Sequence, residues 1–265
     1  MSEIAISPAL ETTLAHVHAG TGKGAEVAMS PVADRSPMPQ RTIKPDHRPR
    51  MAALAAARAQ LAQADPVLRR LIQAQPNLDP RAWLSTLPEM DTFGTLLWQI
   101  IGQQISLRAA RAVLARVQTV FGGQLPTPQE VLATDPAVLH EAGLSRRKAQ
   151  TLRTLAGEFV AGRITAEGLA TMSDSEVEAR LTAVPGVGPW TVHGFLIIAL
   201  DRSDVVLPGD VALRRAIQRA YQLAERPSHD EVLAIAEPWR PYRTLASAYL
   251  FASSSAKGTL DRMAP

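Results

Sequence analysis

Apolar residues recur at steps of three and four along most of this chain, and this spacing restricts its fold more than any other feature. Ser106 is a typical N-cap residue ahead of one such run. The apolar positions of that run are Leu107, Ala110, Leu114, Val117 and Phe121. Ser173 and Glu176 form an S-x-x-E capping box ahead of another run. Runs of alternating β-branched residues are missing, so we expect an all-α fold.

The helical pattern begins near Met51 and predicts one globular domain over residues 51–265. We expect a helix after Ser145, one from the hairpin described below to near Asp201, and others at roughly 211–223, 229–236 and 240–255. Residues 1–50 contain six prolines and no aromatic residue. Such a segment cannot bury enough apolar surface to offset its ordering entropy, so we predict a disordered Pro-rich tail.

Composition excludes several classes of protein. Cysteine is absent from the 265 residues, which rules out disulfides, thiolate zinc sites, iron–sulfur clusters and a cysteine nucleophile. The start of the chain has no basic run followed by an apolar core, and no stretch approaches about 18 apolar residues. We therefore expect a cytoplasmic protein with no membrane contact. The net charge of +3 and the pI near 9.6 are a mild indication of a polyanionic partner.

The stretch VPGVGPW, residues 184–190, is expected to join a helix ending near Val184 to a helix starting near Gly188. Glycine tolerates the positive φ of tight turns, and the free N–H groups at the start of a helix can bind a phosphate. A hairpin that only turns the chain is the alternative, because glycine-containing helix turns are common. The hairpin alone leaves both interpretations open.

Asp210 follows Pro208 and Gly209 and is expected to begin a helix. Aspartate is a preferred N-cap residue, so capping alone explains its position. The functional interpretation is a carboxylate directed at chemistry. The two roles are compatible, because a capping aspartate is rigid and the helix dipole favours its ionised form.

Taken together, these motifs resemble the helix-hairpin-helix, Gly/Pro-Asp superfamily of DNA glycosylases, from about Phe93 to Phe251. IIGQQIS (residues 100–106) looks like the turn that this family inserts at the lesion, and AGLSRRKAQTLRTLA (142–156) is similar to its G-L-S-x-x-K-A segment. PWRPYRTLASAYLF (238–251) matches the P-W-R helix of the 3-methyladenine glycosylase branch. The resemblance implies a helix-hairpin-helix bundle that acts on DNA.

One position separates two chemistries within that superfamily. Members with lyase activity carry a lysine one residue before the hairpin threonine, and its amine attacks the sugar. Here Trp190 precedes Thr191, and tryptophan has no nucleophile. The resemblance therefore implies a monofunctional enzyme that removes a base and leaves the strand intact.

The resemblance also implies roles for particular residues. Asp210 is the expected catalytic carboxylate, and Gln103 and Gln104 are expected to fill the gap left by a flipped nucleotide, although an exposed polar helix end is their plainer interpretation. The expected contacts of the hairpin with the DNA backbone are Pro185, Gly186, Val187, Gly188, Pro189 and Thr191. The expected base-pocket residues are Trp190, Phe251 and Trp98, and the expected phosphate contacts are Ser145, Arg147 and Lys148.

Each pocket aromatic has an alternative role in the core, and for Trp98 the core role is favoured. Gly194 stands where some relatives have a tyrosine, which leaves the pocket less aromatic.

The expected function is base excision repair of double-stranded DNA by a monomer that hydrolyses alkylated purines such as 3-methyladenine. No cofactor is expected, and no metal bound by side chains, but the family resemblance allows a monovalent cation on hairpin backbone carbonyls. A cytoplasmic, nucleoid-associated location follows. The alternatives are a helix-hairpin-helix damage sensor without chemistry, for which Asp210 would have no use, and an all-α protein-interaction domain without salt-dependent DNA affinity.

Overall fold

A computed structural model describes residues 47–255, and all regular structure within that range is helical. The 3-10 helices are η1 (Ala82–Thr86) and η2 (Glu237–Trp239). The α-helices are α1 (His47–Ala64), α2 (Pro66–Ala74), α3 (Thr92–Gly102), α4 (Leu107–Val120), α5 (Pro128–Ala133), α6 (Pro136–Glu141), α7 (Arg146–Val160), α8 (Ala166–Thr171), α9 (Asp174–Thr182), α10 (Pro189–Ile198), α11 (Val211–Ala220), α12 (His229–Ala236) and α13 (Arg243–Ser255). The all-α prediction is confirmed for this part of the chain. Residues 1–46, most of the predicted tail, lie outside the described residues.

The predicted helix starts are fixed by side-chain caps. Ser106, Ser145 and Asp210 each accept a hydrogen bond from the backbone N–H three residues further on. Ser173 and Glu176 form both halves of the capping box. These contacts satisfy N–H groups that a helix cannot pair internally, which is why the sequence alone could locate them.

Three helix boundaries differ from the predicted ones. Helix α10 ends before Asp201 and α11 ends before Gln222, and both residues have positive φ values, 51° and 54° respectively. A left-handed residue cannot continue a right-handed helix. Helix α13 begins at Arg243 instead of near residue 240, and Pro241 in between has no N–H to donate to a helix.

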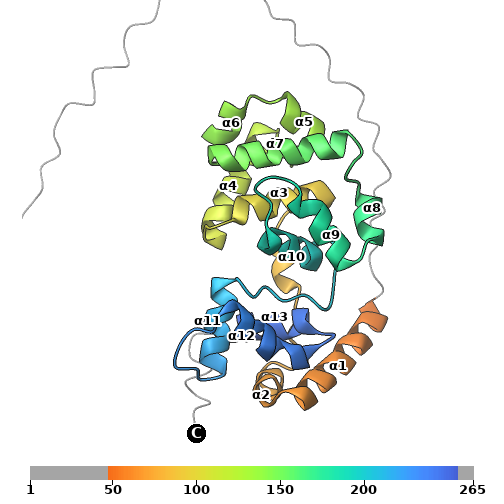
Figure 1. Cartoon of the computed structure of the whole chain (residues 1–265), viewed down its shortest axis with the longest axis vertical. Coiled ribbons are helices and arrows are strands. Elements are labelled where there is room, and N and C mark those ends of the chain that lie inside the picture. The colour runs from red at the N-terminus through yellow and green to blue at the C-terminus, as the bar shows by residue number, and fades with distance from the viewer. Residues whose placement is uncertain (1–46, 256–265) are drawn as a thin grey trace, which may run out of the picture. The chain divides into compact units, whose positions relative to one another are not determined.

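Two clusters of buried side chains hold the described helices together. The first core is formed mainly by α3 to α10, and the second core by α1, α2 and α11 to α13 (Figure 1). Helix α10 takes part in both. Its Val192 and Phe195 are buried in the first core, whereas Trp190 packs against the second. The first turn of α10 therefore lies where the two cores meet.

Asp65 is a buried carboxylate that organises the second core. One oxygen accepts the N–H groups of Val67 and Leu68, at 2.8 and 3.1 Å, at the start of α2. The other accepts Trp239 Nε1–H at 3.0 Å and the hydroxyl of Tyr221. Burial and the neighbouring carboxylate raise the pKa of Tyr221, so its hydroxyl stays protonated as a donor. A buried charge with four donors fixes α2, α11 and η2 to one another.

Of the helices between residues 47 and 255, none combines the length and the hydropathy that a membrane crossing requires.

Candidate active site: the helical hairpin and Asp210

The hairpin between α9 and α10 turns at a residue that must be glycine. Gly186 has a φ of +91°, and a Cβ placed on it would overlap Oγ1 of Thr151 in α7. The turn is closed by a hydrogen bond of 3.0 Å from the N–H of Val187 to the carbonyl of Val184. Glycine is thus required both by the backbone conformation and by the close approach of α7.

The start of α10 is open to an external acceptor. Gly188 is its N-cap residue and supplies no side-chain hydrogen bond, and no heavy atom lies within 4 Å of where a Cβ of Gly188 would be. Pro189 occupies the first helical position. The next N–H groups are those of Trp190 and Thr191, at the positive end of the helix dipole. This arrangement is suited to a phosphate oxygen.

Asp210 and Trp190 form a hydrogen-bonded pair that the sequence did not predict. One oxygen of Asp210 accepts the N–H of Leu213 at 2.8 Å and caps α11. The other accepts Trp190 Nε1–H at 3.0 Å, which joins the start of α11 to the first turn of α10. Asp210 is half-buried, so its remaining lone pairs can reach a water molecule or a ligand. Capping and positioning are both performed by this one carboxylate.

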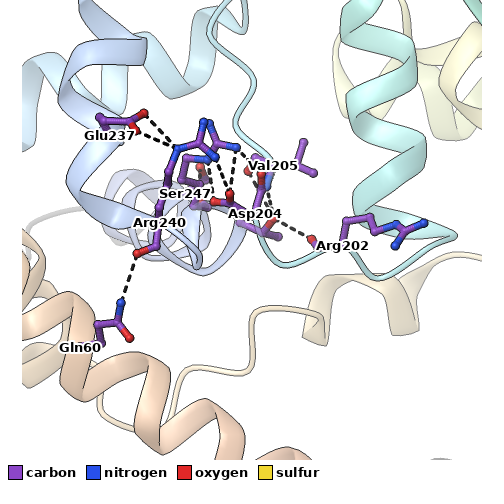
Figure 2. A network of polar contacts seen from close by, with 9 residues as sticks. Gln60, Arg202, Asp204, Val205, Glu237, Arg240 and Ser247 are labelled. Atoms are coloured by element: carbon purple, nitrogen blue, oxygen red, sulfur yellow. Dashed lines mark hydrogen bonds and ion pairs between the residues drawn. The ribbon is translucent and has the colours of Figure 1, made fainter. Parts of the chain in front are cut away.

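The connection that leads from α10 to Asp210 is fixed by ion pairs of Asp204 with Arg240, which follows η2, and with Arg243, which begins α13. Figure 2 shows Asp204 and Arg240. The carboxylate of Asp204 accepts Arg243 Nε at 2.6 Å and Arg240 Nη1 at 2.7 Å. Arg243 also donates to the backbone carbonyl of Asp204 at 2.6 Å. Arg243 is the more enclosed of the two arginines, with 14% of its side chain exposed against 48% for Arg240. The segment before Asp210 is therefore anchored through both the side chain and the backbone carbonyl of Asp204.

Gln103, at the end of α3, is attached to the hairpin. Its Nε2 donates to the carbonyl of Gly186 at 3.0 Å and to Oγ1 of Thr191 at 2.9 Å. Gln104 differs, because it is exposed and has a φ of 57°. The next exposed apolar side chains are Ile105 and Leu107. The two glutamines thus have different surroundings, and Gln104 is the one that faces solvent.

Lys148 is directed into the protein. Its Nζ donates to the carbonyls of Ile101 and Gln103, both at 2.8 Å, at the carboxyl end of α3. Burial lowers its pKa from the ordinary lysine value. Two of the three ammonium N–H groups are therefore committed to α3, and one is left for the predicted phosphate contact. Ser145 and Arg147, its neighbours in that prediction, are exposed.

The predicted pocket aromatics fall into two groups. Trp190 and Phe251 are half-buried and both pack against the second core. Trp98 is only 5% exposed and belongs to the first core, which favours the core role that its sequence context already suggested. Trp190 and Phe251 therefore keep part of their surface exposed, whereas Trp98 is enclosed.

Within residues 47–255, no group of three or more His, Asp or Glu side chains is arranged to hold a metal ion.

Comparison with known proteins matches this geometry to a family. A family model described as "HhH-GPD superfamily base excision DNA repair protein" matches residues 97–241, more than half of the chain. The chain belongs to that superfamily. The matched range includes the hairpin, both glutamines and Asp210, while Phe251 lies beyond it.

Individual superfamily members are similar over most of the chain. DNA-3-methyladenine glycosylase 1 of Schizosaccharomyces pombe is 30% identical over 203 residues, which is 76% of this chain and 88% of that protein. A structure of a 3-methyladenine DNA glycosylase from the same organism with abasic DNA has a TM-score of 0.70 at 30% identity, and covers 76% of this chain and 97% of that one. The 3-methyladenine DNA glycosylase of Archaeoglobus fulgidus has a TM-score of 0.63 at 26% identity, over 81% and 78% of the two chains.

Proposed function

We propose that this superfamily member is a monofunctional DNA glycosylase that flips alkylated purines out of duplex DNA and hydrolyses their N-glycosidic bond. The observation that carries the proposal is the Asp210 carboxylate, held by N–H groups of Leu213 and Trp190 at 2.8 and 3.0 Å. The names of its relatives support 3-methyladenine as one substrate.

The carboxylate supplies the electrostatic part of catalysis. Breaking the bond between base and sugar builds positive charge on the deoxyribose, as in other oxocarbenium-like transition states. A carboxylate about 4 Å from that charge, at an effective dielectric of about 20, stabilises it by about 4 kcal/mol. This corresponds to roughly a thousandfold in rate. Purines alkylated at N3 or N7 are already cationic and leave readily, so these substrates require no second acid.

The side chain of Trp190 determines the outcome for the strand. It stands where lyase members of the superfamily have a lysine, and its indole nitrogen donates to Asp210. With no amine at this position, no Schiff base forms with the sugar. The product is an abasic site in an intact strand.

The DNA contacts are assigned to the hairpin and to the turn after α3. The hairpin residues 185–191 bind the phosphates beside the lesion through backbone N–H groups. The exposed Gln104 fills the space of the flipped nucleotide, and Gln103 anchors that turn to Gly186 and Thr191. Extrusion of the base costs a few kcal/mol of unstacking, which is least for a damaged base.

From the family resemblance we propose that backbone carbonyls of the hairpin hold a monovalent cation. The carbonyls of Val184 and Gly188 already accept N–H groups within the turn and helix, and that of Gly186 accepts Gln103. Each carbonyl has two lone pairs, so these hydrogen bonds leave the hairpin carbonyls able to hold an ion. A cation there would supply positive charge toward a phosphate, while the chain's own N–H groups direct it.

The partner we propose is double-stranded DNA containing a damaged base, bound by a single copy of the chain. The pair Asp210 and Trp190 and the hairpin all come from one chain, so a monomer has the complete site. Such an enzyme would work on nucleoid DNA in the cytoplasm.

Release of free base from a duplex with one methylated or ethenoadenine base tests the proposal, with Asp210→Asn as the variant. Asparagine caps a helix as well as aspartate does, so this change removes the charge and keeps the cap. We expect base release to fall roughly a thousandfold with stability within about 0.5 kcal/mol of wild type.

Asp135→Asn is the matched control, because Asp135 caps α6 through the Ala137 N–H at 2.8 Å. It should release base at the wild-type rate. Equal base release by Asp210→Asn and wild type would refute the catalytic role of Asp210. No base release by wild type would leave a damage-binding protein without chemistry, and strand cleavage without alkali would contradict the role of Trp190.

A further inference from the structure

Gln99 is a buried amide that the mechanism above does not use. It lies within α3, and only 5% of its surface is exposed. Neither amide atom makes a hydrogen bond to any residue in the range 47–255, yet the amide is not fully enclosed. Both amide atoms keep some contact with solvent, so their hydrogen-bonding capacity is open to water or to a ligand.

The amide of Gln99 occupies space that glycine leaves open on α10. A Cβ on Gly194 would lie 2.6 Å from Cδ and 2.9 Å from Nε2 of Gln99, closer than real carbon atoms approach. Any residue but glycine at position 194 would therefore displace the amide.

The contact between α3 and α10 brings the Gln99 amide close to Trp190, the hydrogen-bond partner of Asp210. Gln99 and Gln103 are one turn apart on α3, and Trp190 and Gly194 are one turn apart on α10, about 5.4 Å along each axis. The ring of Trp190 reaches to within 3.9 Å of a Cβ placed on Gly102. Trp190 faces Gly102 on α3, and Gln99 faces Gly194 on α10. The two contacts thus lie about one helical turn apart along the interface between α3 and α10.

We propose that the amide of Gln99 recognises the edge of the flipped base and favours alkylated adenines over alkylated guanines. This inference rests on the glycosylase function proposed above. An amide presents one donor face and one acceptor face, which matches the N6 amino group and N7 of adenine. Guanine presents two acceptors at that edge, O6 and N7, and in 7-methylguanine N7 is blocked. At this edge an adenine can therefore pair with both halves of the Gln99 amide, whereas a guanine can pair with only its donor half.

The test is the ratio of kcat/KM for 3-methyladenine to kcat/KM for 7-methylguanine, measured on matched duplexes with wild type and Gln99→Leu. Leucine is similar in volume and removes the unpaired amide, so the variant should keep its thermal stability. We expect the ratio to fall about ten-fold, with 7-methylguanine release unchanged. Gln73→Leu, at an exposed position of α2, is the control and should leave the ratio unchanged.

Gly194→Ala gives an independent test, because its methyl group displaces the amide while Gln99 itself is retained. It should lower the same ratio. An unchanged ratio in Gln99→Leu, or an equal loss on both substrates, would overturn the assignment and leave Gln99 as a packing residue. Normal base release by wild type with a constant ratio would refute this inference alone, whereas no release from either duplex would refute the proposed glycosylase as well.

Discussion

The substitution Lys148→Met distinguishes two roles of this lysine. The sequence predicts a contact with a DNA phosphate, and the structure shows hydrogen bonds to carbonyls at the end of α3. Methionine keeps the apolar stem and removes the ammonium group. Each of the two hydrogen bonds from Nζ, to the carbonyls of Ile101 and Gln103, measures 2.8 Å. A charged hydrogen bond contributes about 1.5–3 kcal/mol, and water can replace part of this at a half-buried position. We expect a loss of about 2 kcal/mol in the free energy of unfolding.

The same substitution should loosen the turn that carries Gln104, since the ammonium holds the carboxyl end of α3. We expect slower base release at saturating DNA, by about ten-fold if about 1.4 kcal/mol of positioning is lost. DNA affinity should keep most of its dependence on salt, because two of the three ammonium N–H groups are committed to carbonyls. Urea unfolding and binding titrations between low and high salt measure the two quantities.

Arg147→Met is the matched control, as Arg147 is the exposed neighbour on α7. Loss of one phosphate contact should reduce the slope of log K against log salt by about 0.9, with stability unchanged. If Lys148→Met instead had wild-type stability and a salt slope reduced by about 1, the ammonium would contact phosphate, and the reasoning from its carbonyl partners would be refuted.

Three further perturbations follow from other contacts. Gly186→Ala forces a Cβ into the left-handed region and against Thr151, which should cost about 3 kcal/mol and weaken DNA binding; normal affinity and stability would contradict the close approach. Arg243→Met should lower the free energy of unfolding by about 2 kcal/mol and slow base release. Arg240→Met, at a more exposed ion pair, should lower it by under about 0.5 kcal/mol. Equal effects of the two substitutions would contradict the difference in burial. Asp65→Asn should cost about 3 kcal/mol in urea unfolding without changing the specific rate of the folded enzyme, and an altered rate would link the second core to catalysis.

The sequence by itself determined the features that depend on residues a few positions apart. Ser106, Ser145, Ser173 and Asp210 were identified as caps because each pairs with an N–H three residues further on, a contact present in any chain with that local pattern. The hairpin turn at Gly186 was local in the same way, whereas the close approach of Thr151, which also requires glycine there, is a tertiary contact. Family motifs then added the meaning of Asp210, which local chemistry left open between capping and catalysis.

Only the tertiary structure decided which way the polar side chains point. Lys148 was expected at a phosphate and reaches back to α3; Gln103 was grouped with Gln104 and is attached to the hairpin. The bond from Trp190 to Asp210 and the contact of Gln99 with Gly194 were not predicted at all.

These contacts join helices far apart in the chain, and they form because the two cores set the distances between α3, α7, α10 and α11. A periodic pattern records which face of a helix is apolar, and it carries no information about which polar group meets that face from another helix.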